Sequence, residues 1–334
     1  MSDTVLTEVA AQRIFDEQIV PIVFPDEPRS ESPQMTFVVG QPGSAVTRAA
    51  GQLSNGRAVA VLSATELRTF HPRYLKLSRD RSPEGARILQ DSASGWMRSA
   101  LQHARTDKRS LLLDGTLSTP EVALAATGLF STSGFETSVA VVAVPRAESL
   151  LALASKYLLD SREGRASPLT ALADHDKLYL DSRALIETLE TAPSVDQLTI
   201  IDRNGTALFD EPRLDPRGFA GALAALDLAR ESPLSPARAM RWLSELRATT
   251  DFALSLRPIP APLGEVLVQL HEIGRREVVP ALPLPQDSQA RPNAEAALDR
   301  QLLAVRQASQ VESRPERRPG PSVSTPDVDR GISL

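Results

Sequence analysis

The chain has 334 residues, of which 42% are hydrophobic, so it is long enough to form one large domain or two small ones around a buried core. It contains no cysteine, which excludes disulfides and thiolate metal sites, and its four histidines are too far apart for a local ligand cluster. The formal net charge of −5 argues against a nucleic-acid partner.

No apolar run is long enough to indicate a membrane-spanning helix, which needs about 18 or more residues. The first residues, Met1 to Thr4, lack the basic start of a signal peptide. We therefore expect a cytoplasmic protein without a membrane partner.

Short apolar runs alternate with segments that are long enough for helices, and this alternation predicts an α/β fold with a doubly wound, mostly parallel sheet. The expected strands cover residues 35–39, 58–62, 110–113, 138–144 and 198–201. Helical spacing of apolar residues predicts a packing helix over 86–105, and Pro120 is expected to begin another over 121–129.

The composition changes after the last expected strand. From about residue 216 the chain is rich in alanine, and Ser235-Pro236 is typical of a helix N-cap followed by a first-turn proline. Proline and charge then dominate, which predicts a tail that is too polar to fold except for one short helix over 294–308. We divide the chain into a sheet domain at 1–215, a helical extension at 216–280 and a mostly disordered tail at 281–334.

A glycine-rich turn joins the first expected strand to a helix, and it reads Gly40-Gln41-Pro42-Gly43-Ser44-Ala45-Val46-Thr47. In the phosphate-binding pattern GxxxxGK[ST], backbone amides surround the phosphates, the lysine neutralises them and the hydroxyl binds Mg²⁺. Here Ala45 and Val46 replace the second glycine and the lysine, and Thr47 keeps the hydroxyl. By itself the turn is equally typical of an ordinary strand–turn–helix. If the loop needs a positive φ at Ala45, alanine should cost roughly 1 kcal/mol or more there.

Further motifs follow in order along the chain: Thr65-Glu66-Leu67-Arg68-Thr69-Phe70-His71-Pro72-Arg73-Tyr74, Asp114-Gly115-Thr116-Leu117, Ser155-Lys156-Tyr157, Gly164-Arg165-Ala166-Ser167-Pro168 and His175-Asp176. With the loop, they resemble the zeta toxins, P-loop kinases that phosphorylate UDP-N-acetylglucosamine, over roughly residues 10–210. The resemblance implies a sheet of P-loop kinase type, with ATP and Mg²⁺ as cofactors on residues 40–47. It also implies UDP-N-acetylglucosamine or a similar nucleotide sugar as ligand, and an antitoxin or other protein partner.

The resemblance assigns roles to single residues. It places the catalytic aspartate of the family at Thr65, whose hydroxyl cannot act as a base near pH 7. It places the two arginines that clamp the phosphoryl group at Lys156 and Arg165. Thr47 falls at the Mg²⁺-binding hydroxyl, and the substrate-binding positions are Arg68, Asp114 and Thr116.

These departures favour a catalytically impaired kinase, because phosphoryl transfer depends on positioned cations and on a base. Such a pseudokinase would bind a nucleotide or a UDP-sugar without transferring phosphate. One alternative is an active kinase of the family with rearranged cations, acting as a bacterial toxin. A second alternative is an interaction scaffold that needs no ligand.

Overall fold

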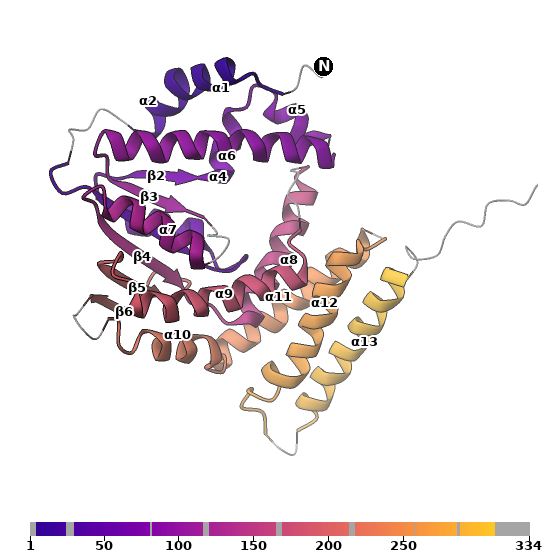
Figure 1. Ribbon diagram of the computed structural model, residues 1–334. Coiled ribbons are helices and arrows are strands. Elements are labelled where there is room, and N and C mark those ends of the chain that lie inside the picture. The colour runs from indigo at the N-terminus through magenta and orange to yellow at the C-terminus, as the bar shows by residue number, and fades with distance from the viewer. Residues whose placement is uncertain are drawn as a thin grey trace, which may run out of the picture.

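The computed structural model describes residues 5–24, 30–80, 82–115, 120–164, 169–213, 218–256, 258–285 and 288–310. Its centre is a six-stranded sheet with the spatial order β2-β3-β1-β4-β5-β6 (Figure 1). The strands are β1 (Gln34–Val39), β2 (Ala60–Ser63), β3 (Leu111–Asp114), β4 (Glu136–Val142), β5 (Gln197–Ile201) and β6 (Ala207–Pro212).

The first five strands are parallel, which confirms the predicted doubly wound α/β class. The sixth strand, β6, is antiparallel to β5 and was not predicted from the sequence. It is an edge strand whose residues are mostly exposed, so it lacks the continuous apolar run that marks the buried strands.

The helices are α1 (Glu8–Ile14), α2 (Val20–Val23), α3 (Val46–Ser54), α4 (Ala64–Leu67), α5 (Tyr74–Arg79), α6 (Pro83–Thr106), α7 (Pro120–Ser131), α8 (Arg146–Arg162), α9 (Leu172–Thr191), α10 (Ala222–Glu231), α11 (Pro236–Ser255), α12 (Ala261–Ile273) and α13 (Ala290–Gln310). The predicted helices over 86–105 and 121–129 correspond to α6 and α7. Among the described residues, none of these helices is long and apolar enough to cross a membrane.

Helices cover both faces of the sheet, and alternate strand residues determine which face they meet. Met35 and Phe37 of β1 point into a large core that includes side chains of α1, α6, α7, α9 and α10. Val38 points to the other face, where Ala49 and Ala50 of α3 complete a smaller core. Successive side chains of a strand point to opposite faces, so helices on both sides bury both faces of the parallel sheet.

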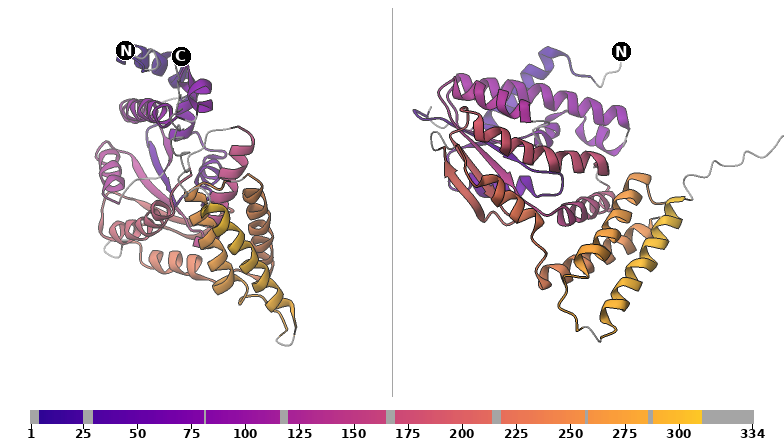
Figure 2. Two further views of the ribbon diagram at one scale, coloured as in Figure 1. Left: turned by 90° about the vertical axis from the view of Figure 1, so that its right-hand side faces the viewer. Right: turned by 60° about the horizontal axis from the view of Figure 1, so that its bottom comes forward.

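The C-terminal helices form a second apolar core with α8 rather than with the sheet. In Figures 1 and 2, α11, α12 and α13 gather beside α8, and α12 and α13 run side by side. Trp242 of α11 donates a hydrogen bond from Nε1 to the carbonyl oxygen of Ala147 at 2.9 Å. Helices α11, α12 and α13 therefore pack on α8, whereas α10, which was expected in the helical extension at 216–280, packs into the core of the sheet.

The described part of the expected tail contains the helix α13, which covers Ala290–Gln310. The expected short helix over 294–308 is longer, and α13 buries Leu298, Val305 and Ala308 in the second core. Packing against α12 supplies the apolar burial that the segment lacks when it is considered alone. Residues 311–334 of the expected tail lie outside the described residues.

Candidate functional site

The glycine-rich loop lies at the carboxyl end of the central strand β1, between β3 and β4. The connection that leaves β1 runs to β2 on one side of it, whereas the connection that leaves the adjacent strand β4 runs to β5 on the other side. Such a switch point is where open α/β sheets bind ligands. The loop then enters α3, whose first-turn N–H groups and helix dipole favour an anion.

The backbone of the loop has the conformation that a phosphate cradle needs. Gly43 has φ of 83°, and a Cβ atom there would lie 2.1 Å from the carbonyl oxygen of Ser149, so only glycine fits. Ala45 has φ of 71° and ψ of 39°, which is the left-handed region. The expectation of a positive φ at this position is confirmed, and an alanine side chain is strained there by roughly 1–2 kcal/mol.

Replacing Ala45 with glycine should therefore stabilise the fold by about 1 kcal/mol, because the strain disappears while some unfolded-chain entropy is added. Urea denaturation of Ala45→Gly measures this gain. Ala50→Gly is the control, since Ala50 lies within α3 and glycine should destabilise that helix by about 1 kcal/mol. A loss of stability in Ala45→Gly would contradict the strain.

Val46 stands where a phosphate-binding lysine would be, and its side chain is part of the fold. It is partly buried and packs against the small core beneath α3, together with Leu53 and Val61. Its Cγ2 atom lies 3.1 Å from the place that a Cβ atom at Gly40 would take. The loop has thus exchanged a phosphate-neutralising cation for an apolar contact.

Thr47 and Asp114 lie together although they come from different elements. Asp114 ends β3 and is 6% exposed, and the hydroxyl of Thr47 lies beside its carboxylate. Burial raises the pKa of Asp114 above its usual range, and the neighbouring Thr47 hydroxyl partly opposes that shift. The second carboxylate oxygen, Oδ2, has no hydrogen-bond partner among the described residues.

A loop hydroxyl beside a carboxylate on the neighbouring strand is the pair that holds Mg²⁺ in P-loop NTPases. The orphaned Oδ2 of Asp114 fits such an ion, which also retains water and phosphate ligands. No group of three or more metal-binding side chains occurs in the described part of the chain, so nucleotide phosphates would have to complete the coordination. The residues present therefore fit Mg²⁺ only together with a nucleotide.

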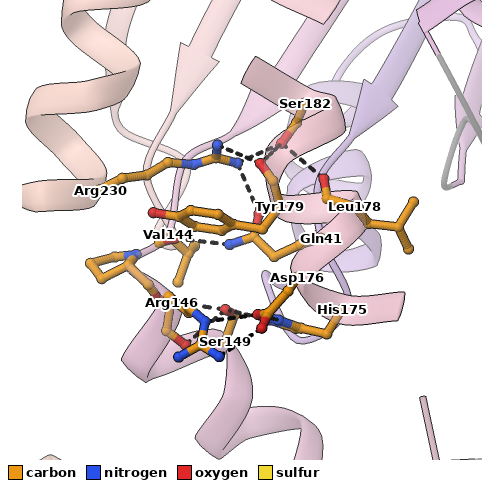
Figure 3. A network of polar contacts seen from close by, with 11 residues as sticks. Gln41, Val144, Arg146, Ser149, His175, Asp176, Leu178, Tyr179, Ser182 and Arg230 are labelled. Carbon is orange, nitrogen blue, oxygen red and sulfur yellow. Dashed lines mark hydrogen bonds and ion pairs between the residues drawn. The ribbon is translucent and has the colours of Figure 1, made fainter. Parts of the chain in front are cut away.

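A buried arginine holds the second residue of the loop (Figure 3). Gln41 is fully buried and donates from Nε2 to the carbonyl oxygen of Val144 at 2.8 Å, while its Oε1 accepts from Nη2 of Arg230 at 3.1 Å. Arg230, from α10, also donates to Ser182 and to the carbonyl oxygen of Tyr179, and its guanidinium lies 4.2 Å from the Tyr179 ring centre. Burial lowers the pKa of Arg230 to about 10, so it remains charged at neutral pH.

A second polar chain joins α8 to α9 beneath the loop (Figure 3). The hydroxyl of Ser149 lies 2.9 Å from His175 Nε2, and His175 Nδ1 lies 3.0 Å from Asp176 Oδ1. Arg146 binds both oxygens of Asp176 at 2.7 Å. Ser149 and His175 are fully buried and connect the two helices, while the side chains of Arg146 and Asp176 are partly exposed. Both His175 and Asp176 lie within the first turns of α9.

The buried state of His175 should make the fold sensitive to acid. Burial lowers its pKa below the ordinary value of 6.5, so the unfolded chain takes up the proton first as the pH falls. The contribution of neutral His175 to the free energy of unfolding is then fully present above about pH 6.5. It is lost as the pH falls through the folded-state pKa, by up to about 1.4 kcal/mol per pH unit.

Urea denaturation from pH 7.5 to 5 should show a shallower acid-side slope for His175→Gln than for the unchanged protein. His271, whose pKa burial also lowers, is present in both proteins and serves as an internal reference. Parallel slopes would show that His175 does not titrate on unfolding.

The remaining predicted site residues fall into three groups. Thr65 is exposed in the first turn of α4, two residues beyond Ser63, which pairs with Asp114 in the sheet, so it lies at the loop edge of the sheet. Arg68 hydrogen-bonds Gln90 of α6, and Lys156 forms an ion pair with Asp160 one helical turn further along α8. Thr116 and Arg165 lie outside the described residues.

The order of the parallel strands, the loop after the central strand and the Thr47–Asp114 pair together define a P-loop fold of the kinase type. Within this class the chain belongs to the zeta toxin family. The model of that family, described as "Zeta toxin", matches residues 23–213, which is more than half of the chain.

Individual relatives are distant in sequence. Toxin zeta of Streptococcus agalactiae is 22% identical over 196 residues, covering 56% of this chain and 67% of that protein. Toxin PezT of Streptococcus pneumoniae serotype 4 is 23% identical over 156 residues, covering 46% of this chain and 60% of that protein. A solved chain of the PezAT chromosomal toxin-antitoxin system of Streptococcus pneumoniae matches with a TM-score of 0.61 at 17% identity. That match covers 76% of this chain and 98% of the solved chain, and at this identity it shows the fold alone.

Proposed function

We propose that this protein is a zeta-toxin pseudokinase, which binds the phosphates of a nucleotide on loop 40–47 but transfers phosphate very slowly or not at all. The observation that supports the proposal most directly is the loop itself, in which Val46 packs into the apolar core where the family has a phosphate-binding cation. Phosphoryl transfer is driven by charge neutralisation and positioning, so this exchange removes a large contribution.

Other departures act in the same direction. Thr65 offers no base for the acceptor hydroxyl, and Lys156 is engaged with Asp160 instead of standing free as a phosphate clamp. Thr47, Asp114 and the left-handed turn at Ala45 retain what nucleotide and Mg²⁺ binding would need. Binding without efficient transfer follows from this combination.

The ligands we propose are ATP with Mg²⁺, and UDP-N-acetylglucosamine or a similar nucleotide sugar, by analogy with the family. An antitoxin is the proposed protein partner, because the PezAT relative belongs to a toxin-antitoxin system.

An active kinase is the second candidate, and one observation favours it. Arg230 places a buried positive charge against Gln41 of the loop, and none of its hydrogen-bond acceptors that the structure describes is a carboxylate. A phosphate on the loop would be attracted by this charge, which could compensate in part for Val46.

The two candidates differ in turnover. Purified protein with ATP, Mg²⁺ and UDP-N-acetylglucosamine should form no phosphorylated sugar nucleotide, while calorimetry should detect binding of ATP. Turnover at a rate comparable with that of toxin zeta of Streptococcus agalactiae, measured in parallel, would establish the active kinase. Absence of binding by ATP, inorganic diphosphate and the sugar nucleotide would favour the scaffold.

A further inference from the structure

The start of helix α8 contacts both the phosphate loop and helix α11. Leu150 and Leu151 of α8 belong to the second core, which also contains Trp242 of α11. Helix α11 lies beyond residues 23–213, the part of the chain that the family model matches. A segment that the family pattern does not describe therefore packs against the helix beside the phosphate loop.

Two main-chain groups at the start of α8 hold the loop. The carbonyl oxygen of Val144, two residues before the helix, accepts the hydrogen bond from the buried Gln41 at 2.8 Å (Figure 3). Gly43 lies so close to α8 that a Cβ atom on it would be 2.1 Å from the carbonyl oxygen of Ser149 and 3.2 Å from the backbone nitrogen of Leu153. Because both contacts are made with main-chain atoms, the position of the loop depends on the position of α8.

Two side chains of α11 hold the same part of α8. Trp242 is 4% exposed and donates from Nε1 to the carbonyl oxygen of Ala147 at 2.9 Å. Arg238 donates from Nε to Oε1 of Glu148 at 2.9 Å, and its Nη2 lies 2.7 Å from the same oxygen. Glu148 is 7% exposed, so water and salt screen this ion pair less than a surface pair. The contacts with α11 thus fall between the two points at which α8 holds the loop.

Residues 144–149 therefore connect the phosphate loop with α11. We propose that Trp242 and Arg238 are positioning residues, which hold the start of α8 and through it keep loop 40–47 in its phosphate-binding arrangement. The inference rests on the proposed phosphate binding and adds its regulation. Coupling between two sites of a protein typically changes an affinity by about 5- to 150-fold. A partner that displaces α11 would then weaken phosphate binding without contacting the loop.

The two tryptophans of the chain provide a matched test of this coupling. Trp96 is 2% exposed and donates from Nε1 to the carbonyl oxygen of Ala11 at 2.9 Å, so it resembles Trp242 but joins α6 to α1. Trp242→Phe and Trp96→Phe each remove one buried hydrogen bond and should destabilise the fold to a similar extent.

Inorganic diphosphate has no base or sugar, so calorimetry with it reports on the loop alone. At a temperature at which both variants are fully folded, a loss of stability by itself does not change the affinity. Trp242→Phe should nevertheless bind diphosphate about fivefold or more weakly than the unchanged protein, whereas Trp96→Phe should bind it equally well. Equal affinities in the two folded variants would contradict the inference.

Variants of Arg238 give a graded test of the same coupling. Arg238→Gln removes the charge that faces Glu148, whereas Arg238→Lys keeps it. The affinity for diphosphate should fall in Arg238→Gln and return toward that of the unchanged protein in Arg238→Lys. Arg275→Gln is the control, because Arg275 pairs with Asp299 of α13 at 3.0 Å, and it should leave the affinity unchanged. Unchanged binding in Arg238→Gln would exclude Arg238 as a positioning residue.

Hydrogen exchange of the full chain without ligand separates this inference from the proposed phosphate binding. The backbone amides of residues 43–49 should exchange about fivefold or more faster in Trp242→Phe than in Trp96→Phe, because the loop has lost part of its support. An unchanged protein that binds no diphosphate would contradict the proposed phosphate binding, while these exchange rates would still decide whether α11 positions the loop. Equal exchange in the two variants would overturn the inference.

Discussion

Removal of residues 286–334 should lower the melting temperature by about 10 °C or more, because the deletion removes α13 from the second core. Leu298, Leu302 and Val305 of this helix are no more than 8% exposed. Burial of each such side chain is worth about 1.5–3 kcal/mol, so their loss is large compared with a typical domain stability of 5–15 kcal/mol. Differential scanning calorimetry measures the change.

The close approach of α12 and α13 supports this expectation. A Cβ atom at Gly264 of α12 would lie 2.4 Å from Oγ of Ser309, so the two helices are in direct contact at this point. A Cβ atom at Gly274, which follows α12, would likewise lie 3.2 Å from Cδ1 of Leu298, so loss of α13 would uncover this buried side of α12.

Neighbouring leucines provide a matched control within the same helix. Leu302 is 8% exposed and Leu303 is 58% exposed. Leu302→Ala should destabilise the protein by about 2–5 kcal/mol, whereas Leu303→Ala should change the stability by less than about 0.5 kcal/mol. A chain that ends after residue 310 retains α13 and separates its contribution from that of the residues beyond. A full deletion with an unchanged melting temperature would show that α13 does not contribute to the core.

The success and failure of the sequence predictions have a common physical cause. The buried parallel strands are continuous apolar runs, and each of the five was located to within about two residues. Strand β6 has exposed residues at the sheet edge, and its pairing is determined by β5 rather than by its own pattern. For α13, the spacing of Leu298, Leu302 and Val305 is helical, but its stability depends on a partner surface on α12 that local composition does not reveal.

In the candidate site, too, the features that the local sequence determines were predicted, and contacts between distant segments of the chain were not. The position of the phosphate loop and the strained φ of Ala45 follow from the local strand–turn–helix pattern. The contact between Thr47 and Asp114 depends on the order of β1 and β3 in the sheet, and the sequence suggested separate roles for these residues. Arg230 and Glu148 were not predicted, because their partners lie far away in the sequence and neither belongs to a motif.

Restoring the loop should recover nucleotide affinity before it recovers chemistry. The double variant Ala45→Gly and Val46→Lys removes the left-handed strain and returns a cation to the phosphates, so calorimetry should show ATP binding at least about tenfold more tightly than in the unchanged protein. The lysine stem can follow the apolar contact that Val46 now makes, with its ammonium group extended toward the phosphates. Ala45→Gly with Val46→Met is the control, since methionine provides an unbranched stem without charge.

Adding Thr65→Asp to the double variant should then produce measurable phosphorylation of UDP-N-acetylglucosamine, because the acceptor hydroxyl regains a base at the loop edge of the sheet. Thr65→Asp alone should leave the ATP affinity unchanged and produce no turnover, since without a cation at position 46 the charge of the phosphates is not neutralised for transfer. The residues at positions 45 and 46 govern binding, and the aspartate at position 65 acts only on a nucleotide that is already bound. If the triple variant stays folded by circular dichroism and binds no ATP, the lost affinity does not lie in Ala45 and Val46, and the interaction-scaffold interpretation replaces the pseudokinase.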